Sequence, residues 1–277
     1  MRRSEPANRV AVKCIFCGND GPQAEEDLFS MWIGRELRRR AGGRVNVVLS
    51  QRQTASDGQI VSPTKHERRQ TFSAIKLPGI CSSCNNNWMS QIEEAASPIL
   101  KAMMNDQQTS LSTEDQFILA RWGALKTLVA DLIDHGFQTF SRLDYKWFYD
   151  NRVPPPDFLL RLGRIDTSGQ DVHYFSLQPI RTGLNLNGIQ ANNPFYLDFE
   201  ISFGPVYMTT RYFNLNTGGY PRPSEIISLI WWTLVWPQNQ STTWPPSSTI
   251  TPEMLPDNQG AWPELQLWID KNLRRKK

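Results

Sequence analysis

The chain has 277 residues, of which 39% are hydrophobic and 11% aromatic, and its net charge is +3. These values exclude an intrinsically disordered chain, because disordered segments combine few aromatic residues with a large net charge. The longest apolar stretch, residues 226–236, is far shorter than the roughly 20 residues that a membrane-spanning helix needs. Residues 1–10 lack the apolar run of a secretory signal. We therefore expect a cytoplasmic protein without a membrane partner.

Short strands and one helix are expected in the first third of the chain. Residues 10–16 predict a strand that leads into a Cys-x-x-Cys pair. Apolar residues then recur at helical spacing and predict a helix over 25–40. Residues 45–49 and 72–77 predict strands, and the polar stretch 51–70 between them predicts a long loop.

Helices dominate the middle of the chain. Apolar residues recur at helical spacing over 88–103, with a kink or break expected at Pro98. A second helix is expected to begin at a capping-box-like segment, Ser112 to Asp115, and to run to about residue 135.

Strands dominate the chain after three consecutive prolines at 154–156. The expected strands are 158–165, 172–179, 196–203 and 206–212. Residues 196–203 alternate apolar with polar side chains, which is typical of a half-buried strand. The pattern therefore predicts an antiparallel β-rich C-terminal part.

All four cysteines lie in two Cys-x-x-Cys pairs, Cys14 with Cys17 and Cys81 with Cys84. Each pair places two thiolates on one tight turn, and two such turns complete the tetrahedral four-sulfur shell that zinc prefers. Between the two pairs lie 63 residues, so the pairs must meet across an inserted element. We expect one structural Zn²⁺, because a closed four-cysteine site has no open coordination position. Redox-active pairs or inert thiols are the alternative.

Three segments carry a family resemblance: CIFCG at 14–18, EEDLFSMWI at 25–33 and ICSSCNNNWMSQIE at 80–93. Together they resemble phage and bacterial HNH endonucleases of the four-cysteine type that have a C-terminal extension. The resemblance covers residues 12–95 and implies a zinc-braced, treble-clef-like ββα-metal finger. The expected fold class is thus α+β. We expect the finger domain in 1–105, and in 106–277 a helical and β-rich domain of unknown role.

The catalytic position of this family departs from its pattern. Where the family has the histidine that acts as general base beside a divalent ion, this chain has Asp27. Aspartate is a much weaker base near neutral pH, since its reference pKa is about 3.9. Glu26 and Asp27 could still hold Mg²⁺ or Mn²⁺ through their hard oxygen ligands. His66, in a basic loop, is the alternative base.

Basic residues cluster near the expected finger. The candidates for nucleic-acid binding are Arg35, Arg38, Arg39, Arg40, Arg68 and Arg69. Clustered basic charge can follow the phosphates of nucleic acid, so DNA is the expected partner. An ordinary solvated helix face is the other interpretation of these charges.

Three functions stay open at this point. The first is an HNH-like nucleic-acid-binding protein with degenerate or weakened phosphodiester hydrolysis. The second is an active metal-dependent HNH DNA endonuclease that uses Asp27, Glu26 or His66. The third is a protein-interaction module whose zinc is purely structural. Glu93 is expected to pair with a basic residue and to take no part in catalysis.

Overall fold

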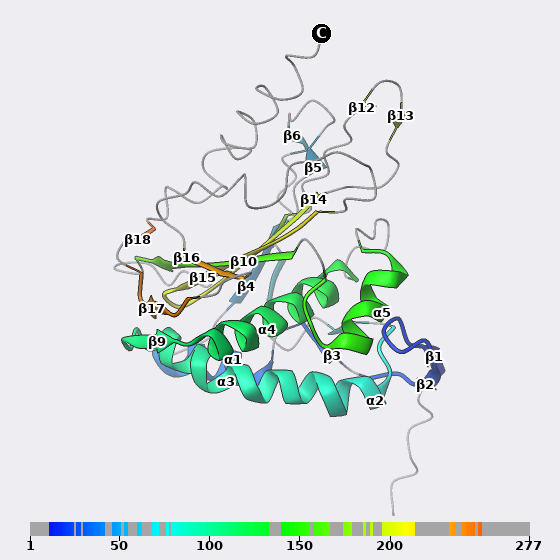
Figure 1. Ribbon diagram of the computed structural model, residues 1–277, viewed down its shortest axis with the longest axis horizontal. Coiled ribbons are helices and arrows are strands. Elements are labelled where there is room, and N and C mark those ends of the chain that lie inside the picture. Colours follow the sequence, from blue (N-terminus) through cyan, green and yellow to red (C-terminus); the bar gives the residue numbers. More distant parts are fainter. Residues whose placement is uncertain are drawn as a thin grey trace, which may run out of the picture.

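The computed structural model describes a large part of the chain. The described residues are 11–24, 26–28, 30–41, 46–50, 53–54, 60–62, 68–71, 76–77, 79–132, 140–155, 158–166, 174–178, 185–186, 189–190, 196–213, 233–236, 240–246 and 249–250. They form a sheet that lies on a layer of helices (Figure 1). Within them, no helix is long and apolar enough to cross a membrane.

An eight-stranded sheet forms one layer. Its main path runs β16-β10-β15-β14-β11-β4-β7, and β18 pairs with β10 beside that path. Most pairs are antiparallel, whereas β4 with β11 and β18 with β10 are parallel. The strands are β4 (Asn46–Ser50), β7 (Arg68–Thr71), β10 (Phe158–Ile165), β11 (Tyr174–Gln178), β14 (Tyr196–Phe203), β15 (Val206–Phe213), β16 (Thr233–Trp236) and β18 (Thr249–Ile250).

The four strands predicted for the C-terminal part are confirmed as β10, β11, β14 and β15. A two-residue turn joins β14 to β15, and Gly204 in it has φ 60°, a left-handed conformation that glycine tolerates best. The predicted mixture of helices with antiparallel strands is therefore confirmed.

Several two-stranded pairs lie outside the large sheet. They are β1 (Ala11–Lys13) with β2 (Asp20–Pro22), β3 (Glu26–Asp27) with β8 (Lys76–Leu77), β5 (Gln53–Thr54) with β6 (Ile60–Ser62), β9 (Thr109–Leu111) with β17 (Thr242–Trp244), and β12 (Asn185–Leu186) with β13 (Ile189–Gln190). The prediction of a long loop over 51–70 was wrong, because β5, β6 and most of β7 fall inside it.

The helices form the second layer. They are α1 (Met31–Ala41), α2 (Ser82–Cys84), the π-helical turn η1 (Asn85–Met89), α3 (Ser90–Met104), α4 (Thr113–Asp131) and α5 (Arg142–Asn151). The helix predicted over 25–40 begins later than expected, at Met31. Its expected first turn contains β3, which pairs with β8 instead, so tertiary pairing overrides the local helical pattern.

Of the kink or break predicted at Pro98, the break is wrong, because α3 continues through this residue. A proline removes the hydrogen bond to the carbonyl four residues earlier, here that of Glu94. Glu94 and Pro98 are both exposed, so water can satisfy this carbonyl and the helix persists.

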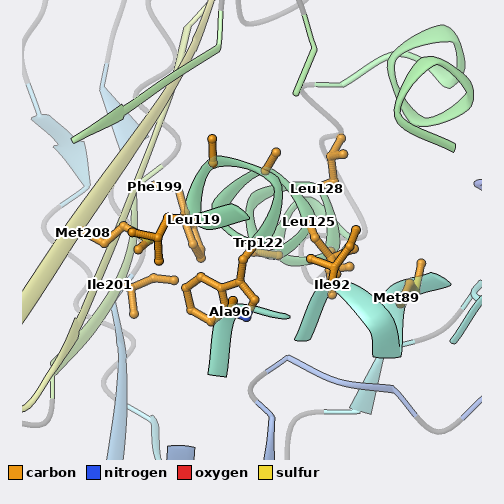
Figure 2. Packing of buried hydrophobic residues seen from close by; sticks show 14 of the residues in the cluster. Met89, Ile92, Ala96, Leu119, Trp122, Leu125, Leu128, Phe199, Ile201 and Met208 are labelled. Atoms are coloured by element: carbon orange, nitrogen blue, oxygen red, sulfur yellow. The ribbon is translucent and has the colours of Figure 1, made fainter. Parts of the chain in front are cut away.

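Helix α4 lies at the centre of the molecule. It begins with the predicted capping box, in which the Asp115 amide donates to Ser112 Oγ at 3.1 Å. Every residue from Trp122 to Asp131 is buried. Sheet residues such as Met208 pack on one side of α4, and residues of η1 and α3 such as Ile92 pack on the other (Figure 2).

One continuous hydrophobic core includes residues of both predicted domains, from Cys14 to Trp244. Strands β4 and β7, which belong to the stretch 1–105, join a sheet built mainly from 106–277. The domain boundary at residue 105 stays a prediction.

Candidate metal centre

The first cysteine pair lies on the turn between β1 and β2. The Gly18 amide donates to the Cys14 carbonyl at 2.9 Å, and the Cys14 amide donates to the Asn19 carbonyl at 3.0 Å. Gly18 has φ +74°, and a left-handed residue of this kind is what the tight turn requires. Cys14 and Cys17 are thereby presented on one side of the hairpin.

The second pair lies where a strand gives way to a helix. Gly79, with φ +82°, precedes Cys81, which is the N-cap of α2. Backbone hydrogen bonds join this segment to the first pair: the Ile15 amide donates to the Gly79 carbonyl at 3.0 Å, and the Ala24 amide to the Ile80 carbonyl at 2.8 Å. The two turns therefore meet directly, although the chain between them is long.

The four sulfur atoms lie within 4.8 Å of one another. Two distances across the pairs, Cys14 Sγ to Cys84 Sγ and Cys17 Sγ to Cys81 Sγ, are both 3.8 Å. A tetrahedron with Zn–S bonds of about 2.3 Å has edges of about 3.8 Å. The donor set and its spacing thus fit one Zn²⁺, with Cys14, Cys81 and Cys84 buried and Cys17 partly exposed.

The thiols of Cys14, Cys17 and Cys84 are close enough to change one another's pKa. The hydrogen bond between the Cys14 and Cys84 thiols lowers the pKa of Cys14 to about 4. The same pairing raises the pKa of Cys84, and burial raises the pKa of Cys17. Zinc is bound by thiolates, so its binding releases the protons that the four thiols hold in the metal-free site.

The predicted catalytic residues are only partly located by the structure. Glu26 and Asp27 form β3, where Glu26 pairs with Leu77 and Asp27 with Lys76. This pairing brings their backbone to the strand that leads into the second cysteine pair. His66 lies outside the described residues.

The predicted nucleic-acid-binding arginines divide into two groups. Arg35 and Arg38 are exposed on α1. Arg39 is also exposed, but its Nη2 donates to Asn105 Oδ1 at 2.8 Å and its side chain pairs with Glu36. For Arg40 in α1, and Arg68 and Arg69 in β7, the structure gives backbone positions.

Glu93 on α3 is the centre of a partly buried polar cluster, of which the sequence predicted only the basic partner. Its carboxylate pairs with Lys126 of α4, as the expectation of a basic partner required, and accepts hydrogen bonds from Ser30 and from Trp122 Nε1. Lys126 is 1% exposed. Trp122 and Lys126 are four residues apart on α4. This spacing, which places two side chains on the same face of a helix, is the sequence signal that could have indicated their shared partner.

Comparison with known proteins gives no match to this chain. No protein-family model matches it, and no curated protein or solved structure matches it either. The function is therefore argued from the site itself.

Proposed function

We propose that this protein binds nucleic acid through a zinc-braced ββα-metal finger of the treble-clef type, similar to that of HNH endonucleases, and that its phosphodiester hydrolysis is weak. The observation that carries this proposal is the convergence of two cysteines from a β-turn with two from the start of a helix. A treble clef takes its ligands from such a pair of elements, and this similarity supports the proposal.

The pairing of β3 with β8 supports the same assignment. Strand β8 pairs antiparallel with β3 and leads into the helical segment α2-η1-α3, although α1 and β4 to β7 lie between β3 and β8 in the chain. Ser30, three residues after Asp27, donates a hydrogen bond to Glu93 on α3. The segment that contains Asp27 is therefore held close to both β8 and α3, the elements that would flank an HNH-like centre.

The chemistry of the available ligands favours binding over cleavage. A zinc ion with four thiolates has no open position at which to activate water. A second ion, Mg²⁺ or Mn²⁺, would need the oxygen ligands of Glu26 and Asp27. Glu93 is already engaged by Lys126, Ser30 and Trp122, so it is a poor substitute. Aspartate in place of the family's histidine leaves a weak general base.

Exposed positive charge on α1 supports contact with phosphates. Arg35 and Arg38 are one turn apart and both are exposed. A protein that neutralises phosphates with such side chains releases condensed counterions, so its affinity falls as salt rises.

DNA binding tests the proposal directly. The affinity of the zinc-loaded protein for a labelled duplex is measured by fluorescence anisotropy over a range of salt concentrations. Replacement of both arginines (Arg35→Ala with Arg38→Ala) should weaken binding and reduce the slope of log K against log[salt] by about 2, since each phosphate contact contributes about 0.9. The charge-matched control, Arg142→Ala with Lys146→Ala on α5, should bind like the wild type. An absence of binding at low salt would contradict the proposal.

Plasmid nicking in Mg²⁺ or Mn²⁺ tests the weak hydrolysis. We expect little nicking by the wild type and an increase on the order of 10²-fold or more for Asp27→His, since a general base contributes roughly 10²–10⁴-fold. Rapid nicking by the wild type that is lost in Asp27→Ala would instead identify an active endonuclease.

A protein-interaction module is the second candidate, because α5 exposes apolar side chains. Leu143 is 77% exposed and Trp147 is 43% exposed, and the two lie one turn apart on the same helix. This function would be favoured if the protein bound no DNA at low salt.

A further inference from the structure

An aromatic cluster attaches helix α5 to the cysteine turns. Phe16, which lies between Cys14 and Cys17, packs edge-to-face against Trp88 of η1 at 5.4 Å and against Tyr145 of α5 at 5.2 Å. Trp88 packs in turn against Phe148 at 5.8 Å and Tyr149 at 6.1 Å. The C-terminal end of α5 therefore lies beside the candidate zinc site, as the position of α5 next to β1, β2 and α2 in Figure 1 shows.

Arg152 ends this helix in an unusual conformation. It is the C-cap of α5, with φ 55° and ψ 29°, and its amide donates to the Phe148 carbonyl at 3.0 Å. Helices commonly end in this left-handed conformation with glycine, because a side chain is disfavoured there. Among the non-glycine residues that the structure describes, Asp106 and Arg152 have a positive φ, which is an uncommon conformation for a residue with a side chain.

The guanidinium of Arg152 is held against two rings. Its central carbon lies 4.2 Å from the ring centroid of Trp88 and 4.6 Å from that of Tyr149. Burial lowers the pKa of Arg152, and the nearby Tyr149 and Cys84 raise it in return. Arginine nevertheless stays charged in proteins, so a fixed positive charge stands at this place.

A hollow of about 480 Å³ joins Arg152 to the sulfur cluster. Three of the four cysteines line it, together with Trp88, Tyr149 and Arg152. In the described part of the chain, the charged residues that line this hollow are Asp20 and Arg152, so Arg152 is its one cation.

The positive charge of Arg152 lies beside a site that would carry a net negative charge when zinc is bound. Four thiolates around Zn²⁺ give a net charge of −2, and a largely buried anion is unfavourable unless a positive charge compensates it. We propose that Arg152 is a positioning residue of the zinc site, whose guanidinium offsets the negative charge of the zinc–thiolate cluster and so couples α5 to zinc binding. The inference rests on the zinc site of the proposed function and is independent of nucleic-acid binding.

Zinc affinity of the purified full chain, measured by competition with a colorimetric chelator, tests the proposal. Arg152→Gly is the informative variant, because glycine suits the left-handed backbone and removes only the side chain. We expect its zinc affinity to fall about 10- to 100-fold, as is typical when an outer partner of metal ligands is lost. Arg142→Ala, which removes an exposed arginine from the same helix, should leave the affinity unchanged.

Arg152→Lys separates charge from stacking. Lysine keeps the positive charge and lacks the planar guanidinium. The zinc affinity of Arg152→Lys should therefore stay close to that of the wild type, because the proposal assigns the effect to the charge. The proposal is overturned if Arg152→Gly binds zinc as tightly as Arg142→Ala does, or if Arg152→Lys loses as much affinity as Arg152→Gly. DNA affinity is not a readout here, so failure of this test is distinct from failure of the nucleic-acid proposal.

Discussion

Two regions of the molecule are stabilised in different ways. The zinc end, residues 11–24 and 79–89, has strands of only three residues, and its buried side chains are largely the cysteines and a few neighbours such as Phe16 and Ile80. The α4 centre, residues 122–131, is buried throughout, and Figure 2 shows sheet residues on one side of α4 and residues of η1 and α3 on the other. The zinc end contributes only a few residues to the shared core, so we expect it to depend on its metal, whereas the well-packed α4 centre depends on apolar burial and on the pairing of its few buried charges.

Loss of zinc should separate the two regions most strongly. Cys81→Ser removes one of the four ligands, and structural zinc contributes on the order of 10 kcal/mol or more of binding free energy in small zinc-finger domains. We expect loss of bound zinc by elemental analysis and fast hydrogen exchange in residues 11–24 and 79–89, with α4 still protected. Ser83→Ala, an exposed change in the same turn, is the control. Equal loss of protection in α4 would show that the two regions are not separable.

Glu93→Gln should produce the next largest effect, because it acts on the α4 centre. The change leaves the ammonium of Lys126 buried without its carboxylate, which typically costs about 3–5 kcal/mol of unfolding free energy. Chemical denaturation at pH 7 measures this loss. Glu94→Gln changes an exposed neighbour on α3 and should be nearly silent.

The same residue gives the centre a pH dependence. Burial alone would raise the pKa of Glu93, but Lys126, Ser30 and Trp122 outweigh it and lower the pKa. A carboxylate with a lowered pKa contributes stability above its unfolded value of about 4.3 and loses it as the pH falls through the folded value. Wild type should therefore lose more stability than Glu93→Gln below about pH 4. Parallel stability curves for the two proteins would contradict this explanation.

The smallest effects are expected at the helix caps, where α4 and α5 each begin with a capping box of one serine and one aspartate. The Asp115 amide donates to Ser112 Oγ at 3.1 Å, and the Asp144 amide donates to Ser141 Oγ at 3.4 Å. Ser112→Ala and Ser141→Ala should each reduce the unfolding free energy by about 1 kcal/mol, measured by urea denaturation. Thr113→Ala is the exposed control beside the first cap. A loss of several kcal/mol from either cap would mean that the serine has a further role.

Features encoded by neighbouring residues were predictable from the sequence. The Cys-x-x-Cys spacing, the alternation over 196–203 and the cap at Ser112 each depend on residues a few positions apart. The clustering of the four cysteines, the strand and the cap are confirmed, and the zinc ion itself stays a prediction. The roles of Asp27 and His66 stay predictions.

Features that depend on distant partners were not predictable in this way. The pairing of β3 with β8 joins segments far apart in the chain, and it displaced the expected first turn of α1. Lysine in a helix is ordinarily exposed. Lys126 is buried because it forms an ion pair with Glu93, which lies on another helix. Arg152 gave no signal either, since its significance depends on the φ angle of the folded helix end.

The parallel pairing of β4 with β11 has a consequence for the order of assembly during synthesis. Val48 pairs with Tyr174, so the ribosome must produce the whole helical layer before β4 can find this neighbour. The cysteines emerge much earlier, and a metal bound to them would tether both ends of the segment that carries β4. Such a tether mainly helps pairings inside that segment, such as β3 with β8 just within the two cysteine pairs, because the entropy of closing their loop is partly spent in advance. We therefore expect zinc supply to influence how quickly the newly made chain folds as well as how stable it becomes.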